Sequence, residues 1–174
     1  MTVEAQTADG TTPPEVLVPF EPDHGPTVVG WPRSRAEIDA WCGLDREVIE
    51  VDQLIAWAAQ ADVLAFVFCK PEDGEPLGYG ELWLDDEEAE VELGRLIVDP
   101  AARNRAVGRR LVIALAEVAR HHFPTVVLRV RRENRAAIAC YRRAGFTSAA
   151  SADQDAWNVG QPQLYLWMQA DDGR

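Results

Sequence analysis

The sequence predicts a single α/β domain whose central, mixed, mostly antiparallel and twisted sheet is flanked by helices. Its 174 residues suit one domain, and a hydrophobic share of 47% beside a charged share of 26% is ordinary for a globular protein. Helix-like and strand-like segments alternate, with a hairpin region before a strand–helix–strand unit. Because hairpins pair antiparallel and crossover helices connect parallel strands, the sheet should contain both kinds of pairing.

The chain begins with a segment that has little apolar surface to bury. Residues 1–15 are polar and rich in threonine, so we interpret them as a disordered tail before one domain over residues 16–174. The segment from residue 24 to 60 has a helical character, but Pro26, Pro32 and Gly43 interrupt it. This region should therefore form two or three short helices.

Strands are expected where apolar residues run continuously or alternate with polar ones. An acidic tip at residues 85–88 separates two such segments and predicts a hairpin. The expected strands cover residues 16–20, 63–69, 77–84, 90–98 and 125–130, with two short ones around Phe146 and over residues 163–169.

Two longer helices are predicted in the second half of the chain. The first should run from near Asn104 to about His121, because apolar residues there are spaced by four, four and three positions. The second should begin after Asn134, a good N-cap residue, and end before Gly145, which suits a left-handed C-terminal position.

Charge and cysteine content narrow the function. A formal net charge of −12 argues against a nucleic-acid backbone or an anionic membrane as the main partner. The charge is compatible with a cationic amine substrate and equally with a role in solubility alone. The three cysteines, Cys42, Cys69 and Cys140, show no paired or metal-like spacing, so we expect reduced thiols, no metal and a cytoplasmic location.

The turn after the strand ending at Val98 is predicted to bind an anion. The first N–H groups of the following helix and its dipole favour negative charge, and Arg103, Arg105, Arg109 and Arg110 surround them. A diphosphate would suit this site. The alternative is that these arginines pair with nearby carboxylates. Neither the P-loop motif nor the dinucleotide-binding glycine motif is present.

This turn resembles the diphosphate-binding signature Q/R-x-x-G-x-G/A of the GNAT N-acetyltransferase superfamily. Arg103 matches its first position and Gly108 its last, while Ala106 replaces the first glycine. A methyl group at Ala106 is expected to crowd the phosphate or to force φ negative.

A second segment carries the same resemblance independently. The family pattern N-x-x-A-x-x-x-Y-x-x-x-G-F is matched by five residues, Asn134, Ala137, Tyr141, Gly145 and Phe146. Seven residues turn a helix by about 700°, so Asn134 and Tyr141 should lie only about 20° apart around the axis and face one cleft. The resemblance implies acetyl-CoA as cosubstrate, bound by Leu96, Ile97, Val98, Arg103, Asn104, Arg105, Ala106, Val107, Gly108, Arg109, Asn134 and Tyr141.

The resemblance also implies catalytic residues. Glu92 is the candidate general base, because histone-type members carry their glutamate six residues before the position of Val98. Strand alternation should place Glu92, Gly94, Leu96 and Val98 on one face. Glu81 on the preceding strand and a water chain are the alternatives, and Glu92 would otherwise be a solvated carboxylate. Tyr141 should stabilise the leaving thiolate of CoA.

The resemblance implies transfer of an acetyl group from acetyl-CoA to a primary amine of a small molecule, peptide or protein. The alternatives are a catalytically weak or inactive module that binds or senses acyl-CoA, and an enzyme that uses longer acyl-CoA. Nothing in the sequence names the acceptor or the oligomeric state, for which a homodimer is one option. Four residues could line the acceptor side: Trp83, Trp157, Asn158 and Tyr165.

Overall fold

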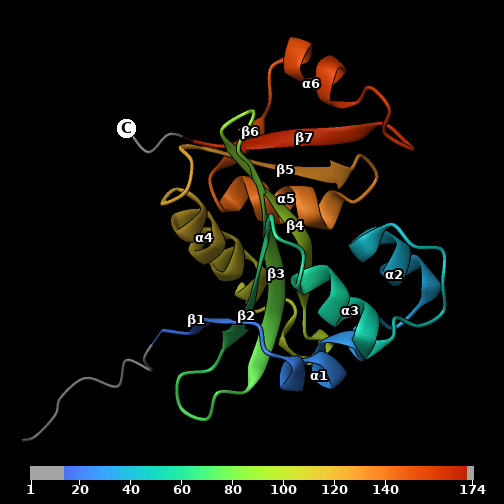
Figure 1. Ribbon diagram of the computed structural model, residues 1–174, viewed down its shortest axis with the longest axis vertical. Helices are drawn as coiled ribbons and strands as arrows, with labels where there is room; N and C mark the ends of the chain where they lie inside the picture. The colour runs from blue at the N-terminus through green and yellow to red at the C-terminus, as the bar shows by residue number, and fades with distance from the viewer. Residues whose placement is uncertain (1–13, 172–174) are drawn as a thin grey trace, which may run out of the picture.

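A computed structural model describes residues 14–171 as one domain around a seven-stranded mixed sheet (Figure 1). The strand order is β1-β2-β3-β4-β5-β7-β6, and β4 and β5 form the parallel pair. The strands are β1 (Val16–Pro19), β2 (Val63–Cys69), β3 (Pro76–Asp85), β4 (Glu90–Val98), β5 (Thr125–Arg131), β6 (Phe146–Ser148) and β7 (Tyr165–Ala170). The predicted fold class is confirmed. The expected tail falls mainly on residues 1–13, which lie outside the described residues; Glu15 pairs with Arg110.

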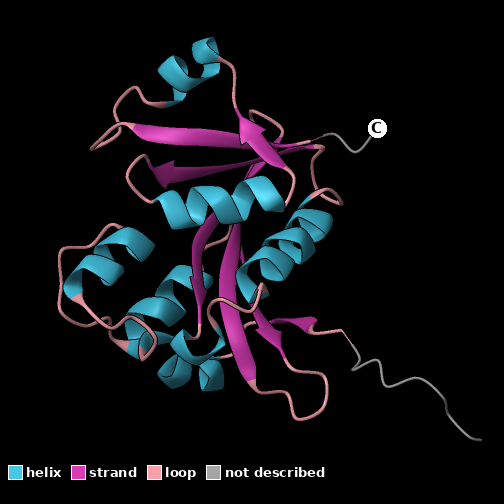
Figure 2. Cartoon of the chain, turned by 180° about the vertical axis from the view of Figure 1, so that it is seen from behind, coloured by secondary structure: helices cyan, strands magenta, loops and turns pink. Residues whose placement is uncertain are grey.

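Helices cover both faces of the sheet (Figures 1 and 2). The α-helices of the described chain are α1 (Gly25–Val29), α2 (Arg35–Cys42), α3 (Val51–Ala58), α4 (Val107–Ala119), α5 (Arg135–Arg143) and α6 (Ser151–Trp157). Two short 3₁₀ turns, Pro22–His24 and Pro100–Ala102, precede α1 and α4. None of these helices has the length and apolar character needed to cross a bilayer.

Two hydrophobic cores hold these layers together. One lies between the sheet and α4 with α5, where Leu82, Leu111 and Leu115 are almost completely buried. The other lies between the opposite face and α1–α3, where Leu54 and Tyr79 are fully buried. Burying a leucine side chain contributes roughly 2–3 kcal/mol, so the two cores fix the sheet from both sides.

Some boundaries differ from the sequence prediction. Helix α4 begins at Val107 rather than near Asn104, because Asn104 and Ala106 have positive φ angles of 63° and 59°. It ends at Ala119, before the expected His121. Helix α6 was not predicted, since it is short and none of its residues is buried. By contrast, Asn134 caps α5 as expected, its side chain accepting a hydrogen bond from the Ala137 N–H.

A β-bulge interrupts β4 in the middle of the sheet. Tyr79 pairs with Ile97 and Glu81 pairs with Gly94, so β4 contains one more residue than β3 between these two pairs. Arg95 lies in the bulge and has a φ of 43°. One extra residue in a strand places every later side chain on the opposite face of the sheet from the one that strict alternation predicts.

The bulge overturns one expectation about β4. Glu92, Gly94, Leu96 and Val98 do not share a face, because the extra residue lies between the two halves of this set. Leu96 and Val98 pack against the core beneath α4. Ile97 packs instead in the core beneath α1–α3 and shares the face of Glu92 and Gly94.

The parallel strands β4 and β5 pair only over a short interval. Residues 90–92 of β4 are in register with residues 125–127 of β5, and no further pairs between these strands occur within residues 14–171. Beyond Glu92 the two strands separate, and a cleft opens between them. This opening leaves one edge of β4 without a neighbouring strand.

Candidate functional site

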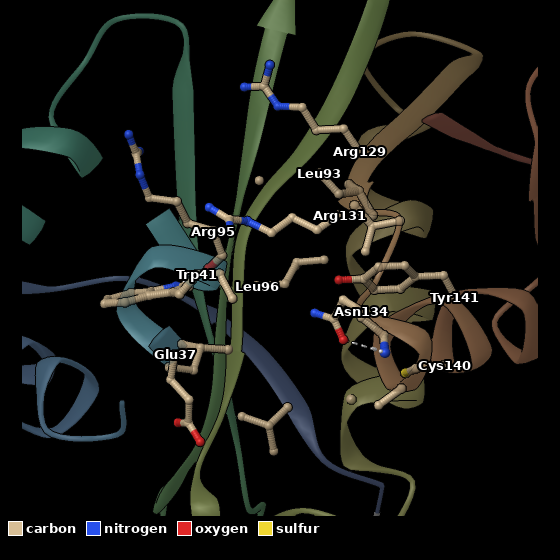
Figure 3. Close-up of a pocket in the computed structure, with 18 of the residues that line it drawn as sticks. Glu37, Trp41, Leu93, Arg95, Leu96, Arg129, Arg131, Asn134, Cys140 and Tyr141 are labelled. Atoms are coloured by element: carbon tan, nitrogen blue, oxygen red, sulfur yellow. Dashed lines mark hydrogen bonds between the residues drawn. The ribbon is translucent and has the colours of Figure 1, made fainter. Parts of the chain in front are cut away.

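The cleft between β4 and β5 has a volume of about 990 Å³. Its walls come from β4, β5, α2, the turn before α4 and α5. Figure 3 labels side chains from α2, β4, β5 and α5 that line it. Nearly all of the predicted site residues meet here. Glu92, Asn134 and Tyr141 line the cleft, as do residues 96–98, 103–104 and 106–108. Arg105 and Arg109, which the sequence also suggested, are exposed and are not among the lining residues.

One end of the cleft is formed by the N-terminus of α4. The N-cap residue Ala106 has no side-chain oxygen and makes no capping hydrogen bond. The first N–H groups of the helix, at Val107 and Gly108, therefore lack a cap and can bind an anion. The expectation that alanine would force φ negative at this turn is wrong, since Ala106 adopts a φ of 59°. Its left-handed backbone is the conformation that glycine would take most easily.

Two of the four arginines around this turn are paired with carboxylates. Arg103 donates two hydrogen bonds of 3.0 Å to Glu37 of α2 and one of 3.2 Å to the carbonyl of Val98. Arg110 is paired with Glu15. The carboxylate-pairing alternative thus holds for these two. Within residues 14–171, Arg105 and Arg109 form no ion pair, so they contribute uncompensated charge near the turn.

Helix α5 presents two predicted residues to the cleft. The Oδ1 atom of Asn134 accepts the Ala137 N–H at 3.2 Å, drawn as a dashed line in Figure 3, which leaves the amide nitrogen of Asn134 able to donate. The Tyr141 hydroxyl points toward Leu96 across the cleft (Figure 3). Burial raises the pKa of Tyr141, so this hydroxyl remains protonated and serves as a hydrogen-bond donor.

Glu92 lies where β4 and β5 begin to separate. Its side chain is 16% exposed, and its Oε1 lies 3.0 Å from Nε of Arg129 on β5. This contact is an ion pair and not a hydrogen bond, and Oε1 has no hydrogen-bond partner among the described residues. Burial raises the pKa of Glu92 to about 7; Arg129 opposes this shift and Glu90 adds to it. Such a carboxyl group can exchange a proton near neutral pH.

Glu81, the alternative base, is in a different situation. It is fully buried and does not line the cleft. Its carboxylate accepts three hydrogen bonds of 2.6 Å, from the Tyr79 hydroxyl, Nε1 of Trp83 and Nη1 of Arg95. With these donors in place, Glu81 holds the bulge and its neighbours in position.

The opposite end of the cleft has aromatic walls. Trp83 and Tyr165 line it, as the sequence suggested. Trp157 instead packs against Trp167, with ring centroids 5.4 Å apart. Asn158 accepts the Tyr165 N–H at 2.8 Å and so holds the loop before β7. Trp157 and Asn158 therefore lie outside the cleft lining, contrary to the prediction.

Sequence reasoning missed several charged and aromatic residues of the cleft. Asp39 and Trp41 reach it from α2, while Arg95 and Arg131 come from β4 and β5. The sequence did contain a sign of the role of Arg95. Under strict alternation, Arg95 would share a face of β4 with the apolar residues Val91, Leu93 and Ile97, where a charge is unusual. Helix α2 lies far from β4 in the sequence, so nothing local indicated its contribution.

Comparison with known proteins identifies the domain. Residues 30–146 match the model of the acetyltransferase (GNAT) family. The aminoglycoside acetyltransferase AAC(6')-Ib, solved with parmomycin and acetyl-CoA, is 18% identical over 91% of this chain and 93% of that one, with a TM-score of 0.71. Spermidine N-acetyltransferase from Vibrio cholerae, solved with CoA and spermine, is 15% identical over 89% and 92%, with a TM-score of 0.67. These similarities show a shared fold.

Proposed function

The chain belongs to the acetyltransferase (GNAT) family, and we propose that it transfers an acetyl group from acetyl-CoA to a primary amine of a small molecule or peptide. The observation that carries this proposal is the meeting of three groups in one cleft. An uncapped helix N-terminus, a tyrosine hydroxyl and a carboxyl group with a pKa near neutrality all line it. Together they provide an anion site, a hydrogen-bond donor and a base.

Acetyl-CoA would lie along the open edge of β4. Its diphosphate would accept hydrogen bonds from the N–H groups of Val107 and Gly108 at the start of α4. Its pantetheine arm would run beside residues 96–98, whose edge facing β5 lacks a strand partner, and the amide of Asn134 would donate to it. A side cavity of about 90 Å³ next to Tyr141 has room for a short acyl group.

The chemistry requires the acceptor to lose a proton. An alkylamine arrives as an ammonium ion, and Glu92 would take its proton directly or through a water molecule. The amine nitrogen then attacks the acetyl carbonyl carbon, forming the C–N bond as the C–S bond breaks and the thiolate of CoA leaves. The Tyr141 hydroxyl would donate a hydrogen bond to the developing thiolate. Glu92 is preferred over Glu81, whose oxygens are already occupied by three donors.

The structure weakens the case for a sensing module without turnover. That alternative was based on Ala106 and on the unproven base, yet Ala106 takes the left-handed conformation that a glycine would supply. The ammonium form of the acceptor is a cation, consistent with an acidic protein. Cys42, Cys69 and Cys140 are free thiols, which supports a reducing compartment such as the cytoplasm.

A binding experiment with CoA tests the cosubstrate site. CoA should raise the melting temperature of the protein, since it binds the folded state. Gly108→Asp should abolish this effect by placing a carboxylate against the diphosphate. Gly108→Ala is the steric control, because a Cβ atom there would lie 3.4 Å from Cys140 Sγ, near ordinary contact. His121→Asp, which adds the same charge beyond the far end of α4, is the charge control.

Catalysis is measured by thiol release from acetyl-CoA with a panel of primary amines. An unchanged melting temperature at millimolar CoA would refute the assignment of the cleft. The proposed transferase activity would be refuted if the protein binds CoA but none of the amines tested supports thiol release.

A further inference from the structure

The cleft carries more positive than negative charge, although the whole chain has a net charge of −12. Five arginines and three carboxylates line it among the described residues. The arginines at the aromatic end are Arg95, Arg129 and Arg131. A cleft built to attract a polycation would instead show an excess of carboxylates.

Each carboxylate that lines the cleft already faces an arginine. Glu37 binds Arg103 at 3.0 Å, and Asp39 binds Arg131 at 2.6 Å. Glu92 lies 3.0 Å from Arg129. A second ammonium group on the acceptor would therefore have to displace one of these guanidinium groups.

The guanidinium groups, in contrast, have N–H groups to spare. A guanidinium has five N–H donors in a planar fork. Arg131 donates to Asp39 through Nη2 alone. Arg129 donates to Oε1 of Gln161 through Nη1 at 2.9 Å, and its Nε lies beside Glu92. Each of the two guanidinium groups therefore keeps N–H donors that an anionic oxygen ligand can use.

Aromatic rings hold two of these arginines in place. The Trp83 ring lies 5.0 Å from the guanidinium carbon of Arg95 and 5.4 Å from that of Arg129. The Tyr165 ring lies 5.5 Å from the same atom of Arg129. These apolar walls exclude water and strengthen any ion pair formed between them. Arg131 reaches across the cleft from β5 toward Trp41 (Figure 3).

We propose that the acceptor is a primary amine that also bears an anionic oxygen group, a carboxylate or a phosphate, which the guanidinium groups of Arg129 and Arg131 bind. This inference rests on the proposed function. The ammonium end would lie against Glu92 and the anionic end against the arginines, so the charges of a zwitterion match those of the cleft. Because Arg129 lies beside Glu92, the two ends of the acceptor are separated by only a few bonds.

Matched pairs of amines that differ only in the anionic group test this proposal. Phenylalanine against 2-phenylethylamine and β-alanine against ethylamine test the carboxylate. O-phosphoethanolamine against ethanolamine tests the phosphate, and spermidine represents the polycations. Thiol release from acetyl-CoA gives kcat and KM for each. The anionic member of at least one pair should have a kcat/KM about tenfold or more above its partner, the value of a charged hydrogen bond.

Variants locate the effect. Arg131→Gln should remove most of the preference, mainly through KM, whereas Arg132→Gln, at an exposed neighbour outside the cleft lining, should retain it. Asp39→Asn removes the carboxylate that occupies Arg131 and should lower the KM of the anionic acceptor. This second variant keeps the test informative if Arg131→Gln folds poorly.

The outcomes separate the two claims. Equal or better turnover of the amines that lack the anionic group, or of spermidine, overturns this inference and leaves the acetyltransferase activity intact. If CoA binds but no amine of the panel supports thiol release, the proposed function is overturned and this inference with it. A preference for the phosphate pair or for a carboxylate pair decides which anionic group the arginines bind.

Discussion

Replacing Glu92 by glutamine keeps the shape of the side chain and removes its ability to accept a proton. Burial raises the pKa of Glu92 from 4.5 to about 7. A difference of this size corresponds to about 3 kcal/mol in favour of the protonated form in the folded protein. It also turns a weak base into one matched to neutral pH, at which about half of the Glu92 side chains would be ionised.

The activity of Glu92→Gln should therefore depend on pH in a specific way. At pH 7, kcat/KM should fall about a hundredfold or more, because no group remains to take the proton of the ammonium ion. The loss should shrink as pH rises, since more of the acceptor then arrives deprotonated. In the wild type, kcat/KM should rise with pH around a pKa near 7. This rise should be absent in the variant.

Stability provides a second readout for Glu92. Its folded pKa lies above its unfolded value, so the stabilisation it gives is present below about pH 4.5 and is lost as pH rises through 7. The wild type should lose about 3 kcal/mol from this group between pH 4.5 and 8. Glu92→Gln should not lose it, so urea denaturation should show a relative gain for the variant at pH 8 over pH 5.

The matched control is Glu90→Gln on the same strand, outside the cleft lining. It should keep near-normal activity at pH 7. Near-normal activity of Glu92→Gln at pH 7 would refute the assignment of Glu92 as base. A loss of the same size at every pH would also contradict it and would indicate that the charge of Glu92 positions the amine.

Two further predictions concern the thiolate and the diphosphate turn. Tyr141→Phe should lower kcat about tenfold or more with little change in the melting shift caused by CoA, because only a hydrogen bond to a charged group is lost. Burial raises the pKa of Tyr141, so this loss should be constant from pH 6 to 9, and an unchanged kcat would leave Tyr141 as a packing residue. Ala106→Gly should stabilise the protein by about 0.5–1 kcal/mol in urea denaturation. The substitution removes left-handed strain of about 1–2 kcal/mol from the folded state. The greater entropy of the unfolded glycine variant offsets somewhat less than that amount. Lower stability of the glycine variant would contradict this account.

Much of the fold could be predicted because local patterns determine it. The strands at 63–69 and 90–98 were located to the residue, since continuous burial and alternation leave few other arrangements. The start of α5 was also correct, because Asn134 caps it through its own side chain. Helix α6 was missed because a short exposed helix has no apolar periodicity to reveal it.

The candidate site was predictable only where it lies on contiguous motifs. The turn before α4 and the start of α5 carry their residues within short segments, so the family resemblance together with helical spacing predicted that Asn134 and Tyr141 line one cleft. The bulge at Arg95 depends on how β4 pairs with β3, which no window of β4 alone specifies. The pairing of Asp39 with Arg131 joins residues 92 positions apart, and only the folded chain brings them together.

The substitution at Ala106 shows what the glycine of such a turn is needed for. The backbone turns left-handed at Ala106 just before α4, and the first N–H groups of the helix have no side-chain cap. Glycine does this without strain, but alanine also does it here, with a φ of 59° and an exposed side chain. The cost to alanine is about 1–2 kcal/mol, which two cores of buried leucine and valine can offset. The requirement at this position is therefore a backbone conformation, and a sequence pattern that specifies only residue type underestimates how many chains can meet it.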